Sequence, residues 1–171
     1  MGFTAGQIED ANIIAVDYEG EESELKQAAE IVAAVVAGNK SVKMLSKNIA
    51  LKEWEERFKA LKLKRGGPSQ LGAEICLPIE KLGLYLKEID KVSSIYRLGL
   101  TSYGHVVDRG HLTVMTMFYA DETKKVSYVI GLSLVKKIQD AGYKYGGYPY
   151  GIGLWNTPYL KRIFTPANLA Q

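Results

Sequence analysis

The alternation of apolar and polar positions divides the first part of the chain into a strand, a helix and a second strand. Apolar runs with β-branched residues, at 11–18 and near 41–46, are typical of strands. Between them, residues 21–38 repeat apolar side chains at helical spacing. Glutamates gather near the start of this stretch and Gly38-Asn39 stands at its end, as expected for the two ends of a helix.

A charged amphipathic helix is predicted next, at 49–64. Trp54, Phe58 and Leu61 form one apolar stripe on it, and a Gly-Gly-Pro-Ser sequence at 66–69 ends it. This helix separates the first strand–helix–strand part from a longer second part.

The second part of the chain alternates in the same way, with a hairpin in its middle. It predicts a strand at 71–77, a helix opened by Pro78, a hairpin of 95–104 and 111–119, a helix at 122–141 with Asp121 as its N-cap, an extended segment at 143–150, and a helix opened by Thr165-Pro166. The residues expected to face the core are Ile79, Leu82, Leu86 and Ile89 on the first helix and Val126, Val129, Ile130, Ser133 and Ile138 on the second.

This order of elements predicts an α+β fold. The hairpin and the short links argue against an all-parallel sheet, so a ferredoxin-like antiparallel sheet with helices on one face fits best. Two halves of the β-α-β type, with the 49–64 helix inserted between or beside them, account for every segment. We expect residues 1–171 to form a single domain.

Composition excludes several classes of protein. A net charge of +3 without a continuous stripe of basic residues gives no indication of nucleic-acid binding. The single cysteine, Cys76, rules out an intramolecular disulfide and favours a reducing compartment, where it would be a buried, inert thiol. Apolar runs fall far short of the ~20 residues that a membrane span needs. We therefore expect a cytoplasmic protein.

Both histidines flank an Asp108-Arg109-Gly110 turn signal. If the hairpin is centred near Asp108, His105 faces His111, and directly opposed Cβ atoms lie about 4.5–5.5 Å apart. Two imidazoles that close could share a metal ion, an anion or a substrate carboxylate. A metal site usually has three or more protein ligands, and no third is evident here.

Two further groups of residues are candidates for binding. The segment 143–155 is dense in tyrosines, which offer a face and a hydroxyl, and in glycines, which let a flat ligand approach the backbone. We expect it to line a ligand or a domain interface. Arg57 and Arg97 are candidates to bind an anionic substrate through a bidentate guanidinium, although solvation on the surface is the better explanation for Arg57 taken alone.

Four motifs resemble those of the FAD-linked oxidases, the flavoenzymes of the vanillyl-alcohol oxidase superfamily that include glycolate oxidase, D-lactate dehydrogenase and D-2-hydroxyglutarate dehydrogenase. They come in the family's order across roughly residues 11–164. Residues 54–57 resemble Trp-x-x-Arg, residues 74–82 resemble Asp-Val-x-Val-Pro-x-x-x-Leu, residues 104–114 resemble Gly-His-x-Gly-Asp-Gly-Asn-x-His, and residues 146–154 resemble Gly-Gly…Gly-Glu-His-Gly-Ile-Gly-Leu.

The resemblance implies the C-terminal, substrate-side cap domain of an FAD-dependent enzyme that oxidises a 2-hydroxy acid such as glycolate or D-lactate. The FAD-binding domain of the same enzyme is the implied partner. That domain and the family's closing Asp-Pro-x-x-x-Leu-Asn-Pro-Gly-Lys segment have no counterpart in these residues. We therefore expect a fragment, or one subunit of a split enzyme, that is inactive by itself and does not retain FAD.

The resemblance also implies roles for particular residues. His105 or His111 would act as the base or hold the carboxylate, and Arg57 or Arg97 would bind the carboxylate. The residues implied to face the flavin or its domain are Tyr148, Tyr150, Gly151 and Gly153.

The chain departs from the family pattern at three places. Its histidines are one residue closer together, Pro149-Tyr150 stands at the family's Glu-His pair, and Gly72 stands where some members carry a basic residue. Since the glutamate joins the histidines wherever members bind a divalent metal, we assign no metal.

Two other interpretations remain open. The tyrosine-rich segment, with Met115 and Met117, would also suit the phenolic ring of an aromatic-alcohol oxidase substrate. A free-standing ferredoxin-like ligand-binding or sensor domain, for example a homodimer that pairs its sheets, would need no flavin.

Overall fold

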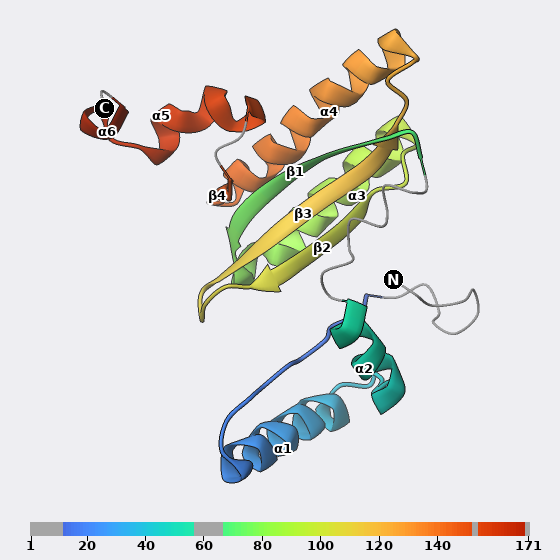
Figure 1. The fold of residues 1–171 in the computed structure, drawn as a ribbon, viewed down its shortest axis with the longest axis vertical. Helices are drawn as coiled ribbons and strands as arrows, with labels where there is room; N and C mark the ends of the chain where they lie inside the picture. The colour runs from blue at the N-terminus through green and yellow to red at the C-terminus, as the bar shows by residue number, and fades with distance from the viewer. Residues whose placement is uncertain (1–11, 57–66, 152–153, 170–171) are drawn as a thin grey trace. The chain divides into compact units, whose positions relative to one another are not determined.

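A computed structural model describes residues 12–56, 67–151 and 154–169 (Figure 1). The chain divides into two units, Met1–Lys62 and Leu63–Gln171, and each is described by itself. Every strand of the described residues belongs to the second unit.

The second unit is built on one antiparallel sheet. Its strands are β1 (Ser69–Pro78), β2 (Thr101–Val106), β3 (His111–Ala120) and β4 (Tyr148–Pro149), in the order β2-β3-β1-β4. Helix α3 (Leu82–Tyr96) follows β1 after the short 3-10 helix η2 (Ile79–Lys81), and α4 (Lys125–Lys144) connects β3 to β4. This β-α-β-β-α-β order is that of a ferredoxin-like unit. The predicted α+β class is confirmed.

The core lies between the sheet and the two helices α3 and α4, which cover the same face (Figure 1). Successive side chains of a strand point to opposite faces, so only alternate residues of β1 and β3 enter this core. Its buried members are Leu71, Ala73, Ile75, Leu77, Tyr85, Ile89, Leu112, Val114, Phe118, Leu134, Val135, Ile138 and Ala141. Of the residues predicted on α3 and just before it, Ile89 is buried, Leu82 and Leu86 are partly buried, and Ile79 is exposed.

The buried side of α4 differs from the predicted one. Val126 and Val129 are 77% and 64% exposed, and Ile130 and Ser133 are exposed as well, so Ile138 is the only predicted residue of this helix that is buried. The side that packs on the sheet instead carries Gly131, Leu134, Val135, Ile138, Ala141 and Gly142. These glycines let the helix approach closely, since a Cβ at Gly142 would clash with the Ile75 side chain and one at Gly131 would lie 2.9 Å from Leu71 Cδ1.

Helix α3 runs further than its apolar pattern predicts. It continues to Tyr96 and stops where Arg97 adopts the left-handed conformation, with φ 53° and ψ 43°. The strand predicted at 95–104 therefore begins only at Thr101.

The ends of α4 also differ from the prediction. Its N-cap residue is Lys124, because the Asp121 carboxylate instead accepts the backbone N–H of Thr123 at 3.0 Å. The helix then extends to Lys144, which shortens the extended segment predicted at 143–150 to the two residues of β4.

The C-terminal part consists of the 3-10 helix η3 (Leu154–Tyr159) and the short helices α5 (Leu160–Ile163) and α6 (Pro166–Leu169). Thr165 Oγ1 accepts the backbone N–H of Asn168 at 3.4 Å. The predicted helix opening at Thr165-Pro166 is thus confirmed.

The described part of the first unit contains two helices and no strand. Helix α1 (Glu22–Gly38) confirms the prediction at 21–38, and the Glu21 backbone N–H donates to Glu24 Oε2 at 3.0 Å at its start. Helix α2 (Lys47–Glu56) covers the first part of the helix predicted at 49–64, and 57–64 lie outside the described residues. The strand predictions are wrong for 12–18 and for 41–46, neither of which pairs with a partner strand. The first ferredoxin-like half therefore lacks its predicted sheet within the described residues.

None of the helices in the described ranges is both long and apolar enough to cross a membrane.

Candidate functional site

The sheet has one face turned away from α3 and α4, which we call the open face. Pairing between strands fixes which side chains point to it, because paired residues lie on the same face. The open face carries His105, Tyr103, His111, Thr113, Met115, Met117, Gln70, Glu74, Cys76 and Tyr148. Both histidines and one of the predicted tyrosines thus share one surface.

One row of paired residues crosses all four strands of the open face. His105 on β2 pairs with Thr113 on β3, Thr113 pairs with Cys76 on β1, and Cys76 pairs with Tyr148 on β4. Neighbouring strands lie about 4.8 Å apart, so the two ends of this row are about 14 Å apart. His105 and Tyr148 therefore lie at the two ends of the row, on opposite edges of the sheet.

The two histidines are not directly opposed, so this prediction is wrong, with the register shifted by two residues. His105 pairs with Thr113, and His111 lies across from Val107, whose N–H donates to the His111 carbonyl at 2.9 Å. The hairpin loop is Asp108–Gly110 because the Asp108 side chain accepts the N–H groups of the residues two and three positions on. The histidines remain diagonal neighbours on one face, with Cβ atoms below about 8 Å apart in ideal geometry.

His111 is paired with a carboxylate at the start of β3. Its Nδ1 lies 3.2 Å from Asp108 Oδ1 and 3.3 Å from Oδ2. Hydrogen bonds from the Gly110 N–H, and then from His111, hold the pKa of the Asp108 carboxyl below its ordinary value. The carboxylate is therefore ionised near neutral pH and can only accept from the imidazole.

Tyr148 lies beside this pair. Its ring centroid is 6.4 Å from that of His111. The Cys76 side chain, followed by partial burial, raises the pKa of Tyr148, and the Asp108 charge adds to the effect. The phenol consequently stays protonated at neutral pH and can donate a hydrogen bond. Cys76 itself is buried, as predicted.

His105 has a different environment from His111. It is exposed, and its ring meets that of Tyr103 edge to face, with the centroids 4.7 Å apart. Tyr103 and Tyr148 give the open face aromatic surface on both edges of the sheet, and the thioether of Met115 lies between them on β3.

Glu74 is a titratable residue of the open face that the sequence did not single out. It lies two residues before Cys76 on β1, and burial raises the pKa of its carboxyl. Strand alternation counted back from Cys76 would have found it. The same count back from His105 gives Tyr103.

The remaining predicted residues are spread over the chain. Arg97 ends α3 and precedes β2, at the end of β2 away from the histidine hairpin, so it is not brought to His111. The Tyr150 N–H donates to the Glu74 carbonyl at 3.3 Å, and the Gly151 carbonyl accepts from the Asn156 amide. The first of these contacts extends the edge of the sheet beyond β4. Arg57 and Gly153 lie outside the described residues.

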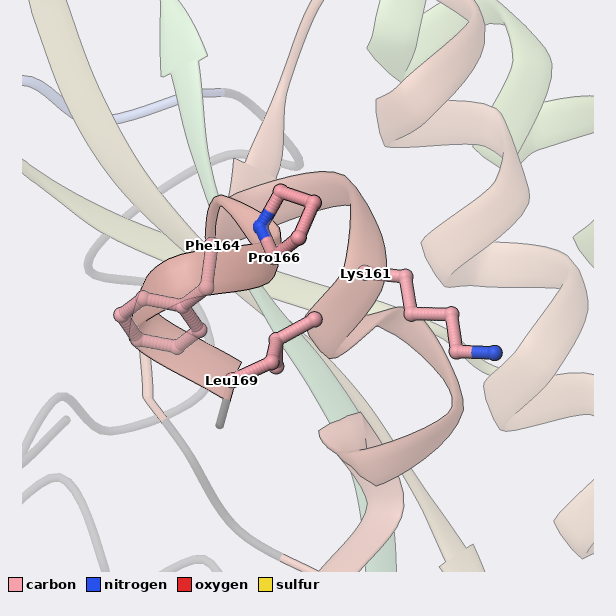
Figure 2. Close-up of a pocket in the computed structure, with 4 residues that line it drawn as sticks. All are labelled: Lys161, Phe164, Pro166 and Leu169. Carbon is pink, nitrogen blue, oxygen red and sulfur yellow. The ribbon is translucent and has the colours of Figure 1, made fainter. Parts of the chain in front are cut away.

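A hollow of the described surface lies elsewhere. It measures about 380 Å³ and is lined by Lys161 of α5, by Phe164 between α5 and α6, and by Pro166 and Leu169 of α6 (Figure 2). The Lys161 amine extends away from the Phe164 ring, which leaves the hollow mainly apolar (Figure 2). None of the open-face residues lines it.

Comparison with known families identifies the chain. The model of the family described as FAD linked oxidases, C-terminal domain, matches residues 5–171. The chain belongs to this family. A search of curated proteins found no match. Membership of the FAD-linked oxidase C-terminal domain family implies an oxidoreductase context, with FAD in the parent enzymes of the family and an N-terminal FAD-binding domain as the partner.

The described residues of this FAD-linked oxidase domain contain no group of three or more His, Cys, Asp or Glu placed to hold a metal ion. What the open face offers instead is an imidazole paired with a carboxylate, a protonated phenol and aromatic surface. Such a set can accept a proton, donate a hydrogen bond and contact a flat ring.

Proposed function

We propose that this domain is the substrate-side part of an enzyme that oxidises a 2-hydroxy acid such as glycolate or D-lactate, together with an FAD-binding domain of the same enzyme. The observation that carries the proposal is the gathering of both histidines and Tyr148 on the open face of a domain of this family. Glycines and tyrosines at 147–151 adjoin the same edge of the sheet.

The residues on the open face fit a flavin. Tyr103 and Tyr148 present aromatic surface and Met115 presents a polarisable thioether, which suit contact with a flat ring system. When bound, FAD would supply the acceptor for the hydride equivalent, which is the chemically difficult part of the oxidation.

The chain's own residues would handle the proton and the carboxylate. Oxidation of a 2-hydroxy acid to a 2-oxo acid removes the hydroxyl proton and, with the electron pair of the Cα–H bond, a hydride equivalent. His111 Nε2 would take the hydroxyl proton, since Nδ1 faces Asp108. The protonated Tyr148 hydroxyl would donate a hydrogen bond to the substrate.

The carboxylate of the substrate needs a cationic or hydrogen-bonding partner. Arg97 lies at the end of β2 away from the hairpin, whereas His105 shares the face and the hairpin with His111. We assign carboxylate binding to His105; Arg57, another predicted candidate, lies outside the described residues.

The test is steady-state kinetics on the enzyme that contains this domain and its FAD-binding domain. His111→Ala is expected to lower kcat by roughly 10²-fold or more, the range of general-base catalysis. His105→Ala is expected to raise KM for the 2-hydroxy acid more than it lowers kcat. Lys137→Ala, on the exposed side of α4, is the control and is expected to change neither. Turnover of His111→Ala at the unsubstituted rate would contradict the proposal.

A second candidate is the oxidation of an aromatic alcohol. It is favoured by the apolar and aromatic side chains of Tyr103, Met115 and Tyr148 on the same face, whereas Met117 is buried. Glycolate, D-lactate and phenolic alcohols assayed on the same enzyme separate the two, because turnover confined to phenolic alcohols would favour this candidate.

A further inference from the structure

The loop at the tip of the β2–β3 hairpin holds a carboxylate against the imidazole of His111. Asp108 Oδ1 accepts the backbone N–H of Gly110 at 2.6 Å and that of His111 at 2.8 Å. Both carboxylate oxygens lie 3.2–3.3 Å from His111 Nδ1. One side chain thus orders the turn and contacts the ring.

We propose that Asp108 is a positioning residue that keeps neutral His111 in the Nδ1–H tautomer, so that its Nε2 lone pair is the one presented on the open face. An ionised carboxylate has no proton to give, so the ring nitrogen that faces it must be the donor. The other nitrogen then carries the lone pair that can accept a proton. Only the use of that lone pair in catalysis rests on the proposed function.

Exposure by itself would make such a pair weak. The Asp108 and His111 side chains are 59% and 42% exposed. Charged pairs at the surface usually add little stability, because the entropy lost in ordering the two side chains offsets their attraction. Here the ordering of Asp108 is already achieved by its two backbone hydrogen bonds. The contact with Nδ1 therefore costs little further conformational freedom.

The other groups around the ring do not compete for Nδ1. Pro78 on β1 pairs with His111 and has no titratable group, and Val107 lies across the loop. Tyr148 on β4 faces the ring, and its neighbour Cys76 is also near. The Tyr148 phenol is neutral at neutral pH, because its pKa is raised above the ordinary value. Among the described residues around the ring, the charged group in contact with His111 is therefore the Asp108 carboxylate.

The tautomer can be measured directly in the 171-residue chain without flavin or substrate. Long-range ¹H–¹⁵N correlation spectra of the ¹⁵N-labelled chain at about pH 9, where imidazoles are neutral, distinguish a protonated ring nitrogen from a bare one. His111 is expected to show the Nδ1–H tautomer as the majority form. A majority of the Nε2–H tautomer in the unsubstituted chain would overturn the proposal without any variant.

Asp108→Asn supplies the matched change. Its amide oxygen can still accept the two backbone N–H groups, while its NH₂ group would donate toward Nδ1 and so favour the Nε2–H tautomer. The Nδ1–H form of His111 is expected to fall from majority to minority. His105, which contacts Tyr103 rather than Asp108, is the control in the same spectrum and is expected not to change. An unchanged tautomer ratio for His111 would overturn the proposal.

Kinetics separate this inference from the proposed function. In the enzyme with its FAD-binding domain, Asp108→Asn is expected to lower kcat roughly 10²-fold at nearly unchanged KM, because the base would present the wrong nitrogen. If the spectra show the Nδ1–H tautomer and the enzyme does not oxidise 2-hydroxy acids, the proposed function fails and the positioning role stands. If oxidation depends on His111 and the spectra show the Nε2–H tautomer, the positioning role fails alone.

Discussion

The hydroxyl of Tyr85 on α3 lies 2.8 Å from the hydroxyl of Thr116 on β3, and both side chains are fully buried. The Thr116 oxygen lies 2.9 Å from Ser102 Oγ on β2. Three hydroxyls thus connect the helix to the two strands that carry His105 and His111 on their other face. This connection supports the sheet directly beneath the candidate site.

We first predict that Tyr85→Phe destabilises the domain by about 1 kcal/mol. The change removes one buried hydrogen bond, and the Thr116 hydroxyl keeps its partner Ser102, so little further desolvation cost arises. The free energy of unfolding from urea titration measures the effect. Tyr119→Phe on the same sheet, where the side chain is 46% exposed, is expected to stay within about 0.5 kcal/mol of the unsubstituted chain.

A loss of stability at alkaline pH is the second prediction. Burial raises the pKa of Tyr85 from 10.0 to about 12. Between these two values the unfolded chain releases the phenolic proton and the folded chain keeps it, so stability falls as pH rises through this window. The loss attributable to Tyr85 is on the order of 2–3 kcal/mol. Unfolding curves from pH 9 to 12 should show it in the unsubstituted chain and less of it in Tyr85→Phe; parallel pH profiles would disprove it.

The third prediction concerns two glycines in helices. Gly142→Ala on α4 would place a Cβ within 2.8 Å of Ile75 Cγ2, and overpacking of this kind costs about 1–3 kcal/mol. Gly83→Ala on α3 meets nothing within 4 Å and is expected to stabilise the domain by about 0.5–1 kcal/mol. Chemical denaturation of both variants tests the sign of each effect. Equal effects would mean that α4 does not approach β1 as closely as described.

The fourth prediction tests which side of α4 is buried. Ile138→Ala should cost about 2–5 kcal/mol, because this side chain is completely buried in the core. Ile130→Ala removes the same atoms from a side chain that is 49% exposed and is expected to cost less than about 1 kcal/mol. Thermal and urea unfolding of the pair provide the comparison, and a larger cost for Ile130→Ala would reverse the assignment of the buried side.

Local signals in the sequence predicted much of the second unit. The helix opening at Thr165-Pro166, the hairpin around Asp108-Arg109-Gly110 and the strand containing Cys76 depend on neighbouring residues and on period-two alternation, which a sequence displays directly. The strand predictions for the first unit were wrong because a strand is stabilised by the strands that pair with it. The run at 12–18 is apolar, and nothing in its own residues supplies a neighbouring strand.

The candidate site was predicted in part for the same reasons. His105 and His111 stood out by type and spacing, and the structure brings them to one face with Tyr148. Their predicted register was wrong by two residues, because the side-chain hydrogen bonds of Asp108 select the loop Asp108–Gly110. Glu74 and Tyr103 were missed, since they join the site only through pairing of strands distant in sequence.

The sequence by itself determined the α+β class, the approximate positions of helices α1 to α4 and the histidine hairpin, because periodicity and turn chemistry act over a few residues. Tertiary structure decided which side of α4 is buried, how β1, β3 and β4 align, and that Cys76, Thr113 and Tyr148 share a row with His105. These features depend on contacts between segments far apart in the chain. On α4, for example, the small volume of Gly142 against Ile75 decides which side packs on the sheet more than the hydrophobicity of the other helix residues does.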